Sequence, residues 1–214
     1  MILVADAFAP VIAAAHVAAD AADRYPVAIA WGLLVTGAVL ALHALGSLLA
    51  GRRAPRRGCG LLGGASYTVA ALAVAGLAAT AFAGVLRTGA MHGWVLWGHT
   101  VAAGAFVVAL PLTALLWGPR NLPGHRPPAA TGPGTNSGSS PAPAIAFSPL
   151  SKLAYWLVLL TGWATLATMV PNMMPWLGTP DLLRMIELHR WAGLGLTLVT
   201  ACHAYLILMG RLGR

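Results

Sequence analysis

Residues 61–86 read LLGGASYTVAALAVAGLAATAFAGVL, a stretch that contains no Asp, Glu, Lys or Arg. An α-helix needs about 20 mostly apolar residues to cross the hydrocarbon core of a bilayer. This stretch is long enough, and it carries no charge that the bilayer would have to accommodate. Four other stretches meet the same two conditions: Val27–Ala50, Gly93–Trp117, Leu153–Leu177 and Trp191–Gly210. The sequence therefore predicts an all-α integral membrane protein, a bundle of five transmembrane helices.

The composition of the whole chain excludes a water-soluble enzyme. Only 8% of the 214 residues are charged and 58% are hydrophobic, whereas a soluble domain has roughly 25% charged residues. The formal net charge of +8 might suggest a nucleic-acid-binding protein. The basic residues flank the apolar segments, however, which is how topology is encoded in membrane proteins. We expect membrane lipid around the chain and no nucleic-acid partner.

Basic residues also predict the orientation of the chain. With five spans, nine of them lie on one side of the membrane: Arg52, Arg53, Arg56, Arg57, Arg120, Arg126, Lys152, Arg211 and Arg214. The other side receives four basic residues and all five acidic ones: Arg24, Arg87, Arg184, Arg190, Asp6, Asp20, Asp23, Asp181 and Glu187. Because positive charge is enriched on the cytoplasmic side, we expect the N-terminus outside and the C-terminus in the cytoplasm. The expected location is the cell inner (cytoplasmic) membrane.

Four parts of the chain follow from these patterns. Residues 1–24 are predicted to form an interfacial segment on the outer face, with a sixth span as the alternative. Residues 25–117 form a three-helix membrane half, and residues 149–214 form a two-helix half. Between them, residues 118–148 are rich in Gly, Pro and Ser, a composition typical of a flexible linker, here on the cytoplasmic side. Proline predicts that the fourth helix ends near Val170 and that the fifth begins near Asp181.

Five histidines lie within or at the edges of the predicted spans: His43, His92, His99, His189 and His203. Ionisable residues inside a membrane are costly and suggest function, although any single one is equally explained by a hydrogen bond between helices. His189 and His203 are fourteen residues apart, close to four whole helical turns, so both point along one face about 21 Å apart. Two stacked b-type haems, each held by a histidine from both sides, would require this arrangement.

Depth along each helix predicts the opposing ligands. His203 lies eight residues before Arg211 and His43 nine before Arg52, about 12 and 13 Å from the inner basic residues. His189 lies twenty-two residues before Arg211 and His99 twenty-one before Arg120, about 33 and 31 Å. These depths pair His43 with His203 on the inner side and His99 with His189 on the outer side.

His92 competes with His99 for the outer position, because it lies seven residues earlier on nearly the same helix face. Its depth, about 42 Å from Arg120, is outside the hydrocarbon core, which favours His99. If His92 is not a ligand, it would line a quinone or proton-exchange site at the outer surface, or be a solvated interfacial histidine. Arg184 and Arg190 on the outer side are candidates to pair with haem propionates; the alternative is a role in topology alone.

The segment LHRWAGLGLTLVTACHAYL, residues 188–206, resembles the haem-bearing helix of bacterial membrane dihaem cytochromes b. These are the quinone-linked cytochrome b subunits of formate dehydrogenases and hydrogenases, and the nitrate reductase gamma subunit is a more distant analogue. The resemblance implies two bis-histidine haems b, with His189 and His203 as paired ligands and His43 and His99 as their partners. It is clear only over this helix. The chain departs from the four-helix pattern by its five spans, its long linker and its two histidines on the third span.

The resulting prediction is an electron-transfer subunit of a membrane redox complex, not catalytic alone. It would carry electrons across the bilayer between a partner subunit and either quinone or a second partner. Two alternatives remain open. One is a haem-free structural subunit of a larger complex. The other is a copper- or metal-handling membrane protein that uses histidines together with sulfur ligands, the candidates being Met169, Met173, Met174, Met185 and Met209.

Overall fold

The computed structural model describes residues 2–49, 61–122, 148–174 and 177–212, and within these ranges it contains helices and no strands. The helices are α1 (Ile2–Leu49), α2 (Leu61–Thr88), α3 (Gly93–Asn121), α4 (Pro149–Met169), the short 3₁₀ helix η1 (Val170–Met173) and α5 (Thr179–Leu212). All five α-helices include a segment long and apolar enough to cross a membrane. The chain therefore has the build of a multi-pass membrane protein, as the sequence predicts.

Two helix boundaries differ from the expected ones. Helix α1 is continuous from Ile2 to Leu49, so no break separates the N-terminal segment from the first span, and its candidate span is Arg24–Ser47. Helix α3 continues past Trp117 to Asn121 although it contains Pro119. The Asn121 side chain donates a hydrogen bond to the Trp117 carbonyl at 2.8 Å, which supports this last turn. The expected linker is thus shortened to residues after Asn121, and residues 123–147 lie outside the described part.

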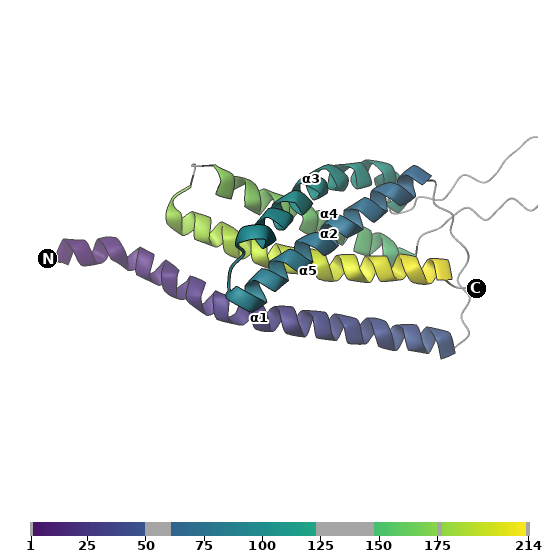
Figure 1. Ribbon diagram of the computed structural model, residues 1–214, viewed down its shortest axis with the longest axis horizontal. Coiled ribbons are helices and arrows are strands. Elements are labelled where there is room, and N and C mark those ends of the chain that lie inside the picture. Colours follow the sequence, from purple (N-terminus) through teal and green to yellow (C-terminus); the bar gives the residue numbers. More distant parts are fainter. Residues whose placement is uncertain (1, 50–60, 123–147, 175–176, 213–214) are drawn as a thin grey trace, which may run out of the picture.

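The two helix boundaries that were predicted from proline, the end of α4 and the start of α5, are as expected. Helix α4 gives way to η1 at Val170, next to Pro171, and α5 begins at Thr179, with Pro180 in its first turn. Proline has no N–H to donate within a helix but fits its first turn. Proline also lies inside α3, at Pro111, and this helix is visibly curved in Figure 1. A sharp bend in a helix commonly occurs at proline.

The helices pack as two antiparallel pairs with one helix at the side (Figure 1). Helix α2 packs mainly against α3, and α4 mainly against α5, while α1 lies along α5 and has the least buried span of the five. The main core is formed by α2–α5 and includes Val74, Phe106, Tyr155 and Leu196. A second cluster joins α1 to α2 and α5 through Tyr25, Ile29, Phe82 and Leu194.

Candidate functional site

His99 of α3 and His189 of α5 lie within electrostatic range of each other, although α3 and α5 do not pack directly against each other in the described part of the chain. Each imidazole is partly buried, and the two are close enough for a charge on one to act on the other. They come from the two different helix pairs, so the space between them is where α2–α3 faces α4–α5. This is the pairing that the depth count predicts for the outer side. We refer to His99 and His189 as the outer histidine pair.

Both rings of the outer histidine pair are held through Nδ1. His189 Nδ1 lies 3.0 Å from the Thr165 carbonyl oxygen of α4 and 3.4 Å from the Thr168 hydroxyl. A carbonyl can only accept, so Nδ1 is the donor in the first contact. His99 Nδ1 lies 3.0 Å from Thr80 Oγ1 of α2. Each ring is therefore oriented by a helix other than its own.

This arrangement suits a pair of metal ligands. A neutral imidazole carries one N–H, and when Nδ1 holds it, the lone pair is on Nε2. Metal-ligating histidines commonly donate their other ring N–H to a carbonyl or similar acceptor, which fixes the tautomer and raises ligand basicity. Space is also present beside His189, because a Cβ placed at Gly193, one turn along α5, would meet nothing within 4 Å. The donor set therefore fits a metal-containing group held by two histidines.

His92 lies apart from this pair. It occupies the position just before α3, with extended backbone (φ −147°, ψ 165°), and its side chain is exposed and caps no backbone group. His99 lies inside the helix, nearly two turns further on. The structure thus brings His99 to His189 and leaves His92 at the end of the helix.

His203 is the most deeply buried of the four predicted ligands, with 4% of its surface exposed. Its ring packs against Tyr67 of α2 and Tyr155 of α4, with ring centroids 5.7 and 6.1 Å away. Nδ1 has no hydrogen-bond partner among the described residues. His203 also lines a small cavity of about 30 Å³. An unpartnered imidazole nitrogen at this depth is costly, and the ring also interacts with the Ser151 backbone.

His43 faces the other side of α5. Its Nδ1 lies 2.6 Å from Tyr205 Oη, its ring meets the Tyr205 ring edge-on at 5.6 Å, and its own surface is exposed. Tyr205 follows His203 by two residues, which is about 200° around a helix. The structure therefore places His43 and His203 at nearly opposite faces of α5, and it does not bring this predicted pair together.

A groove between α2 and α5 lies between these two faces. It has a volume of about 270 Å³ and is lined by residues that include Tyr67, Ala71, Ala204 and Leu208. Ala204 and Leu208 lie about 100° and 140° around α5 from His203. The groove thus occupies the sector between His203 and Tyr205, and Tyr67 lines both the groove and the cavity beside His203.

The two candidate arginines are paired with carboxylates of α5. Arg184 Nη1 lies 3.5 Å from Asp181 Oδ1, and both side chains are well exposed. Arg190 Nη1 lies 3.9 Å from Glu187 Oε2, and its guanidinium carbon is 6.0 Å from the centre of the Tyr25 ring.

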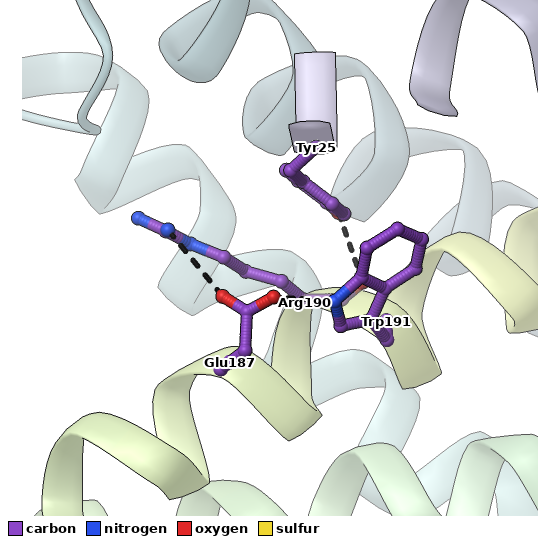
Figure 2. Close-up of polar contacts among 4 residues, drawn as sticks. All are labelled: Tyr25, Glu187, Arg190 and Trp191. Carbon is purple, nitrogen blue, oxygen red and sulfur yellow. Dashed lines mark hydrogen bonds and ion pairs between the residues drawn. The ribbon is translucent and has the colours of Figure 1, made fainter. Parts of the chain in front are cut away.

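Figure 2 shows how this cluster fastens α1 to α5. Tyr25 donates a hydrogen bond of 2.9 Å to the Arg190 carbonyl, and its ring meets the Trp191 ring edge-on at 5.5 Å. The Trp191 indole N–H donates to Glu187. Among the described side chains, Tyr25 of α1 thus contacts α5 at the two residues that follow His189.

Several residues of the site were not identified from the sequence. Thr80, Thr165 and Thr168 hold the outer histidine pair, and Tyr205 holds His43. Their one signal is a hydroxyl group in an otherwise apolar span, which does not reveal a partner nineteen or more residues away on another helix. Comparison of the chain with protein-family models, with curated proteins and with solved structures gave no match.

Proposed function

We propose that this chain is a b-type cytochrome subunit that carries electrons through the membrane, with haems held by paired histidines. The observation that carries the proposal is the outer histidine pair. Two histidines from separate helix pairs lie within electrostatic range of each other; Nδ1 of His99 is bonded to α2 and Nδ1 of His189 to α4. A hydrogen bond between helices would explain one such histidine. It does not by itself explain why two such histidines lie within electrostatic range of each other, each oriented through Nδ1.

Haem, when bound, would supply one-electron transfer chemistry, and His99 and His189 are the residues that would hold it. The residues of this chain would bind and orient the group. His99 and His189 would hold the group from both sides, and Thr80 and Thr165 keep their rings in place. Arg190, next to His189, is the candidate partner for a propionate; the Glu187 carboxylate already occupies its guanidinium.

The proposal also includes a second haem on His203, for which the structure does not bring the two predicted ligands to one place. The neighbouring groove and the deep burial of His203 favour a ligand there. His43 would have to leave Tyr205, and α1 would have to turn or shift along α5, before both histidines faced one group. Electron transfer across the bilayer between a partner subunit and quinone, or a second partner, requires this inner position. The inner membrane as location and the cytoplasmic C-terminus belong to the same proposal.

No observation specifically supports either of the two alternative functions. No three His, Cys, Asp or Glu side chains gather into a metal-ion site anywhere in the described ranges. A haem held by two axial histidines needs no such group, whereas a metal-handling protein of the predicted kind would depend on its methionines as well. A haem-free structural subunit is the outcome that the experiment below separates from the proposal.

The test is to purify the full chain in detergent and to measure haem per chain by pyridine haemochrome and by reduced-minus-oxidised spectra. We expect two haems b per chain, one lost in His99→Ala and in His189→Ala, and the other lost in His203→Ala and in His43→Ala. His92→Ala is the matched control on α3 and should keep both. Circular dichroism and gel filtration establish that each variant is folded. A folded, colourless wild-type chain would refute the proposal.

A further inference from the structure

Thr80 of α2 has its hydrogen-bond directions fixed by its surroundings. Its Oγ1 lies 2.7 Å from the Gly76 carbonyl oxygen, 3.1 Å from the Leu77 carbonyl oxygen and 3.0 Å from His99 Nδ1. A hydroxyl has a single proton, and carbonyl oxygens can only accept. The proton of Thr80 therefore points along its own helix, and the oxygen presents a lone pair to His99.

It follows that His99 is the donor in its contact with Thr80. Nδ1 of the neutral ring carries the proton, and Nε2 carries the lone pair. If the Thr80 proton pointed at His99 instead, the two side chains would form one hydrogen bond, whereas donation by His99 leaves the Thr80 proton to bond a backbone carbonyl of its own helix and so gives two. The bond to Gly76, at 2.7 Å the shortest of the three, also agrees with this direction.

The two members of the outer histidine pair differ in what holds them. His189 donates to the backbone carbonyl of Thr165, an acceptor that no side-chain substitution removes. His99 donates to a side-chain oxygen, and the Leu77 backbone of the same helix also acts on its ring, so its orientation depends in part on the identity of one residue of α2. The packing around Thr80 is close as well, since a Cβ at Gly98 would lie 3.6 Å from the Thr80 methyl carbon.

We propose that Thr80 is a positioning residue that fixes the tautomer and the ring orientation of His99 and thereby tunes the iron ligand at the outer site. The inference rests on the proposed function for its redox consequence, but the tautomer itself belongs to the protein alone. Hydrogen bonds of this kind make the ligating nitrogen more basic. A more basic ligand favours ferric iron, so removal of the bond should raise the reduction potential of the outer haem.

The experiment compares three variants of the full chain: Thr80→Val, which keeps the shape and removes the oxygen; Thr80→Ser, which keeps the oxygen; and Thr100→Val. Thr100 is the matched control because it is next to His99 in the sequence, and its exposed hydroxyl donates to the Leu96 carbonyl at 3.0 Å. The first readout is ¹⁵N NMR of the histidine rings in the haem-free protein. We expect the Nδ1–H tautomer of His99 in the wild type, Thr80→Ser and Thr100→Val, and a mixture of tautomers in Thr80→Val.

The second readout is haem binding and redox titration. We expect Thr80→Val to bind the outer haem about 10- to 100-fold more weakly, the usual effect of losing such a partner, and to shift its potential upward. Thr80→Ser should restore both quantities, and Thr100→Val should change neither. An unchanged His99 tautomer in Thr80→Val, or an unchanged outer haem in that variant, would overturn the role of Thr80. A wild-type chain that binds no haem would instead refute the proposed function, and the NMR comparison would still decide the role of Thr80.

Discussion

Gly162 of α4 lies where this helix touches α3 most closely. A Cβ at this position would lie 3.0 and 3.1 Å from the two terminal methyl carbons of Leu110 and 3.1 Å from Phe106 Cζ. Phe106 and Leu110 are 1% and 2% exposed, so neither has free space into which it can move. Replacement of Gly162 by Ala should therefore push α4 away from α3. Thr165, three residues further along α4, accepts the hydrogen bond from His189, so the outer site would move with it.

The magnitude follows from two opposing effects. Forcing a methyl group into a packed interior costs about 1–3 kcal/mol, whereas replacing Gly by Ala inside a helix gains about 0.5–1 kcal/mol. The net loss of stability for Gly162→Ala is then about 0–2.5 kcal/mol by these two terms. Gly104→Ala of α3 is the matched control, because a Cβ there meets nothing within 4 Å. It should show only the gain, so the difference between the two variants isolates the steric cost.

Reversible unfolding in mixed detergent micelles, followed by circular dichroism, measures both variants against the wild type. We expect Gly162→Ala to be less stable and Gly104→Ala to be equally or more stable than the wild type. If Gly162→Ala were as stable as Gly104→Ala, the close contact between α3 and α4 would not exist in solution, and the reasoning would be refuted.

Three further predictions concern the contacts between helices and the topology. Tyr25→Phe removes the hydrogen bond to the Arg190 carbonyl and should lower stability by about 0.5–1.5 kcal/mol, as measured by the same unfolding assay; no change would mean that the bond does not fasten α1 to α5. Tyr155→Phe removes the bond of 3.1 Å to the Thr113 carbonyl and should cost a similar amount, about 1 kcal/mol, with the α3–α4 contact loosened; a stability equal to that of the wild type would contradict this. Reporter fusions to the two ends of the chain should report opposite sides of the membrane, with the C-terminus in the cytoplasm, and equal reporter signals from both ends would contradict five crossings.

The extent of the apolar segments was enough to predict the fold class and most helix ends. In a bilayer every backbone N–H and C=O group must form its hydrogen bond within the chain. An uncharged stretch such as 61–86 is therefore expected to form a helix. Proline at 171 and 180 marked the end of α4 and the start of α5 for an equally local reason. The continuity of α1 through residue 24 was not predictable in this way, because charged residues in a helix change its preferred surroundings without breaking it.

The sequence by itself determined the position of each histidine along its helix, because each residue advances a helix by a fixed 1.5 Å. That count was sufficient to favour His99 over His92 as the residue facing His189. It could not determine how the helices are rotated about their axes, which depends on the side chains packed between them. Only the tertiary structure decided that His203 faces Tyr67 and Tyr155 while His43 meets Tyr205 across another face of α5. For the same reason only the structure gave His99 its acceptor in Thr80, since contacts between helices depend on rotation as well as depth.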